Sequence, residues 1–339
     1  MRVFVTGGAG FIGSHTLVQL LRKGAEVLVF DNYCNSSPEA LKRVKRLAQS
    51  DFSIVEGDIC DPAALARAMQ DFRPDAVIHF AGLKAVGESA EKPLSYYKTN
   101  ISGSIALLEA MEAVACRKIV FSSSATVYDP GGQPPFTEQD RLGAVNPYGK
   151  TKHFIEELIR DWCASNSENA AAILRYFNPV GAHASGDIGE DPVGIPNNLV
   201  PFIARVAQGR LPQLQVFGGD YPTRDGTGER DYIHVEDLAE AHLAALDYIT
   251  ATKACETINI GTGTATSVLE MLRAFERAAG KPIPYRITAQ RQGDVARSFA
   301  DASKAKALLG WQAKYDIEAM CQSVWNWQSR NPKGYDSAE

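Results

Sequence analysis

The sequence predicts an α/β fold in which a doubly wound parallel sheet is followed by a smaller, discontinuous C-terminal domain for the substrate. Three observations support this prediction. Short β-branched runs alternate with segments that are apolar at helical spacing, and the strand cores are almost continuously apolar. A glycine-rich turn also joins the first strand to the first helix. Parallel sheets covered by helices on both faces produce this pattern, and the glycine turn makes the sheet Rossmann-type.

Strands and helices alternate regularly through the first half of the chain. The helix expected at 14–23 is apolar at Leu17, Leu20 and Leu21 and stops at Gly24. The helix at 62–70 follows Asp61, its expected N-cap. Strands are expected at 3–6, 26–30, 53–56, 76–80, 118–122 and 171–174, and further helices at 41–49, 95–114 and 148–163.

The composition changes after Asn178. The segment 178–231 is rich in Gly, Pro, Asp and Asn, and we expect loops and small elements laid over a site. Strands are expected at 257–260 and 285–288, helices at 268–279 and 303–309, and a frayed end at 334–339. We therefore assign residues 1–177, with a returning segment at about 231–260, to the Rossmann domain, and residues 178–230 and 261–339 to the substrate domain.

Composition excludes several classes of function. The 339 residues suit one large domain or two intimate ones. A net charge of −5 with mixed signs disfavours a nucleic-acid or anionic-membrane partner, and no apolar run approaches the ~18 residues of a membrane span. The first residues already form a predicted core strand, so no signal peptide is expected. Six scattered cysteines without CxxC then indicate reduced thiols in the cytoplasm, and six histidines without ligand spacing predict no metal site.

The turn at 6–13 carries a phosphate-binding motif. It reads GxGxxG at 8, 10 and 13, and GxxGxxG at 7, 10 and 13, between a strand and a helix. Glycines let the backbone approach a pyrophosphate, which then lies at the helix N-terminus. Asp31 at the tip of the second strand suits ribose hydroxyls and repels a 2′-phosphate, so the motif predicts NAD rather than NADP. The alternative is a merely tight turn.

Tyr148 and Lys152 form the candidate catalytic pair. Tyr148 is the only one of twelve tyrosines with a lysine four residues later, and that spacing puts both side chains on one helix face. A nearby ammonium favours the phenolate of a group that otherwise titrates at about 10. The serines 122–124 end the fifth strand, where ligands of open α/β sheets bind. The alternatives are a surface ion pair, and capping or turn roles for Ser122 and Ser123.

Longer strings show a family resemblance over nearly the whole chain. The sequence resembles the extended short-chain dehydrogenase/reductases and, within them, the UDP-glucose 4-epimerase family. The strings that carry the resemblance are GGAGFIGSH at 7–15, DNYCNS at 31–36, EGDI at 56–59, HFAGLKAVGES at 79–89, SSSATVY at 122–128, NPYGKTK at 146–152, LRYFNPVGAH at 174–183, GIPNNL at 194–199, DGTGERDYIHV at 225–235 and WQSRNPKGY at 327–335.

The resemblance implies three sets of site residues. The catalytic residues would be Tyr148, Lys152 and Ser124. The NAD-binding residues would be Gly7, Gly10, Phe11, Ile12, Gly13, Asp31, Asn32, Tyr33, Cys34, Asn35, Ser36, Asp58, Ile59, Phe80, Ala81, Gly82, Leu83, Lys84, Asn100, Ser122, Tyr148, Lys152, Tyr176 and Phe177. The substrate-binding residues would be Lys84, Ser124, Tyr148, Phe177, Asn178, Asn198, Leu199, Gln215, Val216, Phe217, Arg230, Arg291, Asp294 and Ser298.

The implied reaction interconverts UDP-galactose and UDP-glucose through transient oxidation at C4 with bound NAD, rotation of the 4-keto sugar and re-reduction. Tyr148 would take the hydroxyl proton, directly or through Ser124, and two arginines, Arg230 and Arg291, would hold the diphosphate. The alternative for these arginines is a surface ion pair with Asp231 or Asp294.

The resemblance also implies a homodimer through the helices at 95–114 and 148–163. An apolar surplus on these helices supports it, formed by Ile101, Ile105, Leu108, Met111, Phe154, Leu158 and Trp162. The alternative is that all of these side chains face the sheet.

The chain departs from the family at two positions and has a small residue at a third. Asp129 replaces a usual glycine, and Thr99 stands where some members carry an asparagine. Ser298 occupies the family's gate beside the sugar C2 substituent, where a small residue admits N-acetylated sugars, so UDP-GlcNAc and UDP-GalNAc are expected as further substrates. Arg297 or the Asp129 loop could instead refill this space.

Two rival functions share the fold. A nucleotide-sugar 4,6-dehydratase needs carboxylates after the strand-five serine, where this chain has Ala125 and Thr126. A non-catalytic NAD-binding regulator usually loses the tyrosine or the lysine, and both are present here.

Overall fold

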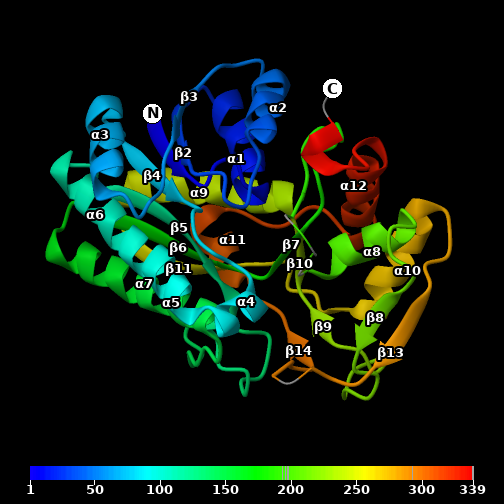
Figure 1. Ribbon diagram of the computed structural model, residues 1–339. Coiled ribbons are helices and arrows are strands. Elements are labelled where there is room, and N and C mark those ends of the chain that lie inside the picture. Colours follow the sequence, from blue (N-terminus) through cyan, green and yellow to red (C-terminus); the bar gives the residue numbers. More distant parts are fainter. Residues whose placement is uncertain (193, 195, 197, 292, 338–339) are drawn as a thin grey trace.

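A seven-stranded parallel sheet forms the centre of the larger part of the molecule. The computed structural model describes residues 1–337 except 193, 195, 197 and 292. The strand order is β11-β6-β5-β4-β1-β2-β3 (Figure 1). The strands are β1 (Arg2–Thr6), β2 (Glu26–Asp31), β3 (Ser53–Glu56), β4 (Ala76–His79), β5 (Lys118–Ser124), β6 (Ala170–Tyr176) and β11 (Cys255–Ile260). The predicted fold class is confirmed, because every strand pair of this sheet is parallel.

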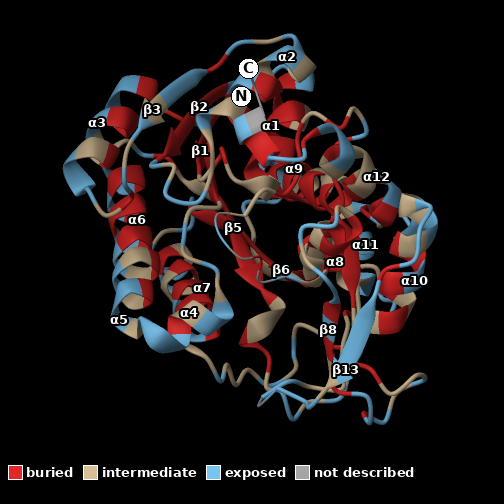
Figure 2. Ribbon diagram, turned by 45° about the vertical axis from the view of Figure 1, so that its right-hand side comes forward, coloured by how far each residue is buried: buried red, intermediate tan, exposed pale blue. Residues whose placement is uncertain are grey.

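Helices cover both faces of this sheet. One face carries α1 (Phe11–Arg22), α2 (Pro38–Ala48) and α9 (Val235–Thr252), and the other carries α3 (Pro62–Phe72), α6 (Gly103–Ala113) and α7 (Pro147–Ser165). The inner strands between them are buried, whereas β3 at one edge of the sheet is mostly exposed (Figure 2). Asp61 caps α3 as expected, accepting from the backbone N–H groups of Ala63 and Ala64 at 3.0 and 3.1 Å. We call the sheet and these helices the sheet lobe.

The expected single helix at 95–114 is wrong in detail. The structure has α4 (Val86–Glu91), α5 (Pro93–Tyr96), a π-helical segment (Tyr97–Ser102) and then α6. Asn100 lies in the π-helical segment and is 2% exposed. Its side chain accepts from the N–H of Leu83 at 2.8 Å and donates to the oxygen of Leu83 at 3.0 Å. Wide helical turns often occur at functional sites, and this one fixes the segment that follows β4.

A smaller lobe packs beside the sheet lobe (Figure 1). Its core is formed by the helices α8 (Leu199–Ala207), α10 (Val268–Ala279) and α12 (Ile317–Arg330) with the strand β8 (Leu214–Phe217). The mostly exposed strand β13 (Tyr285–Thr288) pairs with β8 in parallel. The remaining elements are β7 (Asn178–Val180), β9 (Glu229–Arg230), β10 (Tyr232–His234), β12 (Thr266–Ser267), β14 (Arg297–Ser298), α11 (Ser303–Leu309) and two 3-10 turns, Ala125–Val127 and Gly334–Ser337.

The segment 178–231 contains loops and small elements as expected, namely α8 and several short strands. Two other expectations about the second half need correction. The sequence analysis missed α9 and α12. The chain end does not fray through 334–337, because Tyr335 is 7% exposed and packs on Trp327 with ring centroids 4.9 Å apart; residues 338–339 lie outside the described part. No helix in the described part of the chain is long and apolar enough to span a membrane.

Candidate functional site

The glycine turn brings the start of α1 close to the end of β4. A Cβ atom on Gly7, whose φ is +69°, would lie 2.6 Å from the backbone nitrogen of Ala81, and a Cβ on Gly13 would overlap the Gly7 oxygen. Gly10 is the N-cap of α1 and has no side chain to cap the helix. The first-turn N–H groups therefore face the pocket without a side-chain acceptor from the cap, which suits a bound anion.

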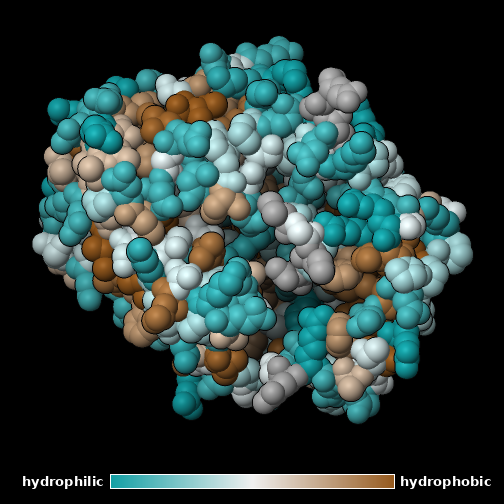
Figure 3. Space-filling model, in the orientation of Figure 1, coloured by the Kyte–Doolittle hydropathy of each residue, from teal (hydrophilic) through white to brown (hydrophobic). Residues whose placement is uncertain are grey.

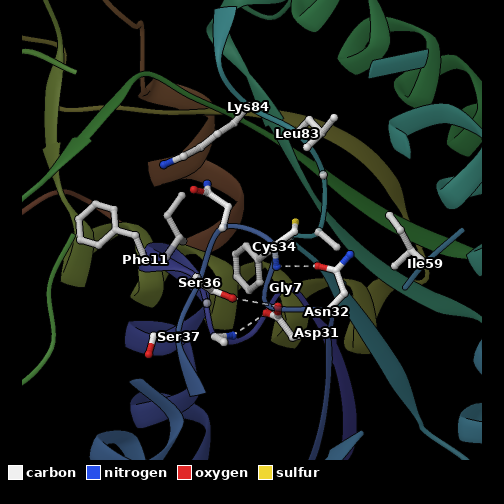
Figure 4. A pocket seen from close by; sticks show the side chains of 18 of the residues that line it. Gly7, Phe11, Asp31, Asn32, Cys34, Ser36, Ser37, Ile59, Leu83 and Lys84 are labelled. Atoms are coloured by element: carbon white, nitrogen blue, oxygen red, sulfur yellow. Dashed lines mark hydrogen bonds between the residues drawn. The ribbon is translucent and has the colours of Figure 1, made fainter. Parts of the chain in front are cut away.

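Asp31 ties this turn to the end of β2. Its carboxylate accepts from the N–H of Ala9 at 2.9 Å, from the N–H of Tyr33 at 2.9 Å and from Ser36 Oγ at 3.0 Å. Figure 4 shows Asp31 bonded to Ser36 at the lower side of the pocket, with Asn32 beside it, whose side-chain oxygen accepts from the N–H of Cys34 at 3.1 Å. The acid expected to meet the ribose thus also orders the loop that surrounds it.

Most of the predicted NAD-binding residues line this pocket, which lies at the carboxyl ends of β1, β2 and β4. The predicted residues that line it are Gly7, Gly10, Phe11, Ile12, Gly13, Asp31, Asn32, Cys34, Asn35, Ser36, Asp58, Ile59, Phe80, Ala81, Gly82, Leu83, Lys84, Tyr148, Lys152 and Tyr176. Four others are not in the lining: Tyr33, Asn100, Ser122 and Phe177. Sequence reasoning missed a wall formed by Gly189, Glu190, Asp191, Pro192 and Tyr335, and it missed Thr99.

Helix α7 presents Tyr148 and Lys152 to the same pocket. Asn146 caps the helix, accepting from the N–H of Gly149 at 2.8 Å, and Pro147 occupies the first turn. Tyr148 and Lys152 are 7% and 5% exposed. Lys152 Nζ donates to the backbone oxygen of Ser122 at 2.7 Å, and it lies 5.9 Å from the centroid of the Tyr148 ring. The helical spacing thus brings the two side chains together as expected.

Burial dominates the electrostatics of this pair. It raises the pKa of Tyr148 above its ordinary value, against a hydrogen bond with the Ser124 side chain that lowers it. Burial also lowers the pKa of Lys152 to about 8, although the Glu156 carboxylate opposes the shift. The Tyr148/Lys152 spacing predicts a lowered pKa for the Tyr148 phenol. The burial of Tyr148 instead raises that pKa.

The three serines at the end of β5 have different partners. Ser122 Oγ lies 2.8 Å from Nε2 of the buried His242. Ser123 Oγ donates to Glu156 Oε1 at 2.5 Å. Ser124 Oγ contacts Tyr148 and accepts from the N–H of Thr126 at 3.2 Å. Only Ser124 has its hydroxyl beside the tyrosine.

A second cavity of about 520 Å³ lies in the smaller lobe, and the surface is hollowed between the two lobes (Figure 3). Nine predicted substrate residues line it: Asn178, Asn198, Leu199, Gln215, Val216, Phe217, Arg230, Arg291 and Asp294. Lys84 and Tyr148 line the first pocket instead, and Ser124, Phe177 and Ser298 line neither. Sequence reasoning missed Tyr221, Tyr232, Phe202 and Val268, whose aromatic or apolar character alone gave no functional signal.

Charged groups converge on this second cavity. The Arg291 guanidinium lies 3.7 Å from the centroid of the Phe217 ring. Arg230 reaches Asp294 only at 4.0 Å and donates to the backbone oxygen of Glu229 at 2.9 Å. Asp231 accepts from the N–H groups of Thr262 and Gly263 at 2.8 and 3.0 Å. Of the two ion pairs considered as alternatives for Arg230, the structure thus contains the one with Asp294, and its length indicates a weak contact.

Comparisons with known proteins agree on one family. The family model described as GDP-mannose 4,6 dehydratase matches residues 4–324. The chain is 55% identical to the UDP-glucose 4-epimerase of Bacillus subtilis (strain 168), over 100% of both chains. Two similar solved structures are UDP-glucose 4-epimerases that contain the cofactor. The Stenotrophomonas maltophila enzyme with bound NAD and formylated UDP-arabinopyranose is 50% identical, with a TM-score of 0.96 over 98% of this chain and 99% of that one. The Bifidobacterium longum enzyme in complex with NAD⁺ and UDP is 50% identical, with a TM-score of 0.95 over 98% and 100%.

Proposed function

The chain belongs to the UDP-glucose 4-epimerases, which are NAD-dependent isomerases, and on this premise we propose that Tyr148, Ser124 and Lys152 carry out the proton transfer at C4 of a UDP-linked hexose. The observation that carries the proposal is the place of Tyr148. Its hydroxyl contacts Ser124, and its ring shares a pocket wall with Lys152 and the glycine turn. A cavity lined by two arginines lies in the neighbouring lobe.

The residues of the first pocket fit a dinucleotide. The glycine turn leaves no room for a Cβ at Gly7 or Gly13, the N-terminus of α1 opens on the pocket, and Asp31 lies at the end of β2. The glycine turn, the start of α1 and Asp31 would hold the dinucleotide, which when bound would supply the hydride chemistry at C4 of the hexose in both directions.

The side chains of this protein transfer the proton of the 4-hydroxyl and bind the substrate. Tyr148 takes the proton of the 4-hydroxyl, directly or through Ser124, and later returns it. Lys152, held by the Ser122 carbonyl oxygen, supplies a positive charge that favours the phenolate. Arg230 and Arg291 offer forked donors to the diphosphate. If UDP is bound firmly and the hexose loosely, the hexose can rotate and present either face to the cofactor.

The direct test uses purified protein without added NAD. We expect UDP-galactose to be converted to UDP-glucose, with the product identified by chromatography against both standards. A 4,6-dehydratase would release a 4-keto-6-deoxy sugar instead, and a non-catalytic regulator would leave UDP-galactose unchanged. Either of these results would contradict the proposal.

We also propose that the enzyme accepts UDP-GlcNAc and UDP-GalNAc, and the register of β14 supports this. Ser298 pairs with Arg230 and Arg297 with Glu229. Because neighbouring residues of a strand point to opposite faces, Ser298 shares its face with Arg230, which lines the second cavity. Serine leaves at that position the volume that an acetamido group needs.

Arg297 and the Asp129 loop, which could instead fill the space beside Ser298, are hydrogen-bonded elsewhere. Arg297 Nε donates to Glu229 Oε2 at 2.8 Å, on the opposite face of the strand from Ser298. The Asp129 carboxylate accepts from the N–H of Gly131 at 2.9 Å and pairs with Arg141 at 3.3 Å, so it is used within its own loop. Both contacts favour an open gate.

Ser298→Tyr tests the gate. We expect it to abolish turnover of UDP-GalNAc and to leave turnover of UDP-galactose within about 3-fold, because a phenol ring occupies the acetamido space but not the space of a hydroxyl. Ser298→Ala is the matched control and should keep both activities. Equal loss on both sugars, or no wild-type activity with UDP-GalNAc, would contradict the proposal.

We further propose that the protein is a cytoplasmic homodimer. All six cysteines are unbridged, in keeping with a reducing compartment. The apolar surplus behind the dimer is smaller than the sequence suggests. Leu108, Met111 and Trp162 are buried in the sheet lobe, whereas Ile105 and Phe154 remain 39% and 53% exposed.

A further inference from the structure

The C-terminal segment forms part of the NAD pocket. After α12 the chain passes back toward α2, so the end that is last in sequence lies beside an early helix of the sheet lobe (Figure 1). Tyr335, in the turn Gly334–Ser337, lines the pocket together with the loop 189–192. None of these residues belongs to the glycine motif or to the catalytic pair.

Tyr335 is hydrogen-bonded to the backbone of the loop 189–192. Its hydroxyl accepts from the N–H of Gly189 at 3.3 Å and donates to the oxygen of Gly189 at 3.2 Å. Its own N–H donates to Asp191 Oδ2 at 2.8 Å. A single buried tyrosine thus makes three hydrogen bonds to the loop 189–192.

Arg43 of α2 ties the same segments together from the other side. Its Nη1 donates to the oxygen of Asp187 at 3.0 Å and to Asn331 Oδ1 at 2.7 Å. Its guanidinium carbon lies 5.2 Å from the centroid of the Tyr335 ring, and the residue is only 7% exposed. Buried arginines are retained where their donors are used, so this corner is a built junction rather than a chance contact.

The far edge of the loop meets the opposite wall of the pocket. Glu190 Oε1 lies 3.6 Å from Nζ of Lys84, which follows β4. Lys84 extends along the upper side of the pocket, toward the side on which Phe11 lies (Figure 4). The loop 189–192 thus meets Lys84 in a long ion pair and Tyr335 in three hydrogen bonds. Glu190 is also held by Trp327 Nε1, which donates to its backbone oxygen at 3.2 Å, and by Asn198 Nδ2, which donates to its Oε1 at 3.0 Å.

We infer that Tyr335 is a positioning residue for the cofactor, which holds the loop 189–192 in the wall of the NAD pocket and so slows release of the dinucleotide between the two half-reactions. The inference rests on the proposed function, in which the same NAD must receive a hydride and return it. An enzyme that lost NADH between the two steps would release a keto sugar, so slow cofactor release serves this chemistry in particular.

The test is Tyr335→Phe, which removes one oxygen and keeps the packed ring. We expect NAD to dissociate about 10-fold faster. This is the rate increase expected when the two hydrogen bonds of the Tyr335 hydroxyl are removed. Release is measured as loss of bound NAD in the presence of charcoal. On dilution the variant should lose turnover that added NAD restores, whereas a merely destabilised fold would not recover. Tyr315→Phe, in a 40% exposed tyrosine outside both pockets, is the matched control and should release NAD at the wild-type rate.

A second variant approaches from the loop side. A Cβ on Gly189 would lie 2.6 Å from Cδ1 of Trp327, so Gly189→Ala must displace the loop from its bonds with Tyr335 while the tyrosine itself is kept. It should also release NAD faster. Wild-type release rates in both variants would overturn the inference while leaving the epimerase proposal intact. A wild-type protein that binds no NAD would instead overturn the proposed function.

Discussion

At the scale of single residues, the proposed proton transfer depends on one phenol oxygen, that of Tyr148. Tyr148→Phe keeps the ring, which is 7% exposed, and removes only the group that exchanges the proton. We expect an unchanged fold and bound NAD with at least ~10²-fold lower turnover, the lower end of general-base effects. Steady-state kinetics with UDP-galactose and the absorbance of bound NAD measure both. Near-normal turnover would remove Tyr148 from its role.

Lys152 makes a second residue-scale prediction, about stability. Burial lowers the pKa of its ammonium to about 8 from 10.5, so the folded protein carries a cost that is complete below pH 8 and vanishes above 10.5. That cost is about 3 kcal/mol of unfolding free energy. The hydrogen bond from Lys152 Nζ to the Ser122 oxygen offsets roughly 1 kcal/mol of it. Lys152→Met should therefore abolish turnover yet melt at a higher temperature than wild type at pH 7, and the difference should shrink at pH 10. A variant that melts lower than wild type at pH 7 would contradict this assignment.

At the scale of elements, α7 is joined to the sheet by a buried ion pair. Glu156 and Arg175 are 0% and 1% exposed, and Arg175 Nη2 donates to Glu156 Oε2 at 2.6 Å. Removing one partner leaves a buried charge without its counter-ion, so Glu156→Ala should cost ~3–5 kcal/mol of unfolding free energy in a urea titration. Glu157→Ala, the exposed neighbour on α7, should cost no more than ~0.5 kcal/mol. Similar losses of unfolding free energy in Glu156→Ala and Glu157→Ala would contradict a stabilising role for the buried ion pair.

The same elements show how far sequence alone reaches. The strands of the sheet and the helix that carries Tyr148 were predictable because each is a local run with its own cap or breaker, such as Asp61 and Gly24. The break in the helix at 95–114 was not predictable, because it depends on Asn100 bonding to Leu83, a contact across the fold. The ordered position of Tyr335 was not predictable for the same reason, since its partners are 144 and 146 residues away in sequence.

At the scale of the whole molecule, the two sites differ in how visible they are in sequence. The first pocket, proposed to hold NAD, could be predicted from contiguous motifs, because one turn and one strand tip supply its floor. The second cavity draws its lining from separate segments between Asn178 and Asp294, and its residues could be named only through the family resemblance. Tyr221 and Tyr232 belong to that lining but carry no motif of their own.

The assembly of two copies is the last prediction at this scale. Hydrophobic side chains gather over α5 and α7 on the surface (Figure 3), and the exposed ones on α5, α6 and α7 are Leu94, Ile105 and Phe154. Isolated exposed apolar residues are ordinary, but three on adjoining helices, with Leu94 81% exposed, favour a covered face. Phe154→Glu would place a charge in that interface and should weaken the dimer at least ~30-fold, the effect of losing a hot-spot aromatic. Light scattering after gel filtration measures the mass at micromolar concentration, and Tyr285→Glu, which alters an exposed tyrosine on β13, is the control that should stay dimeric. A monomeric wild type, or a Phe154→Glu protein with the wild-type mass at every concentration, would show that this face is not the dimer interface.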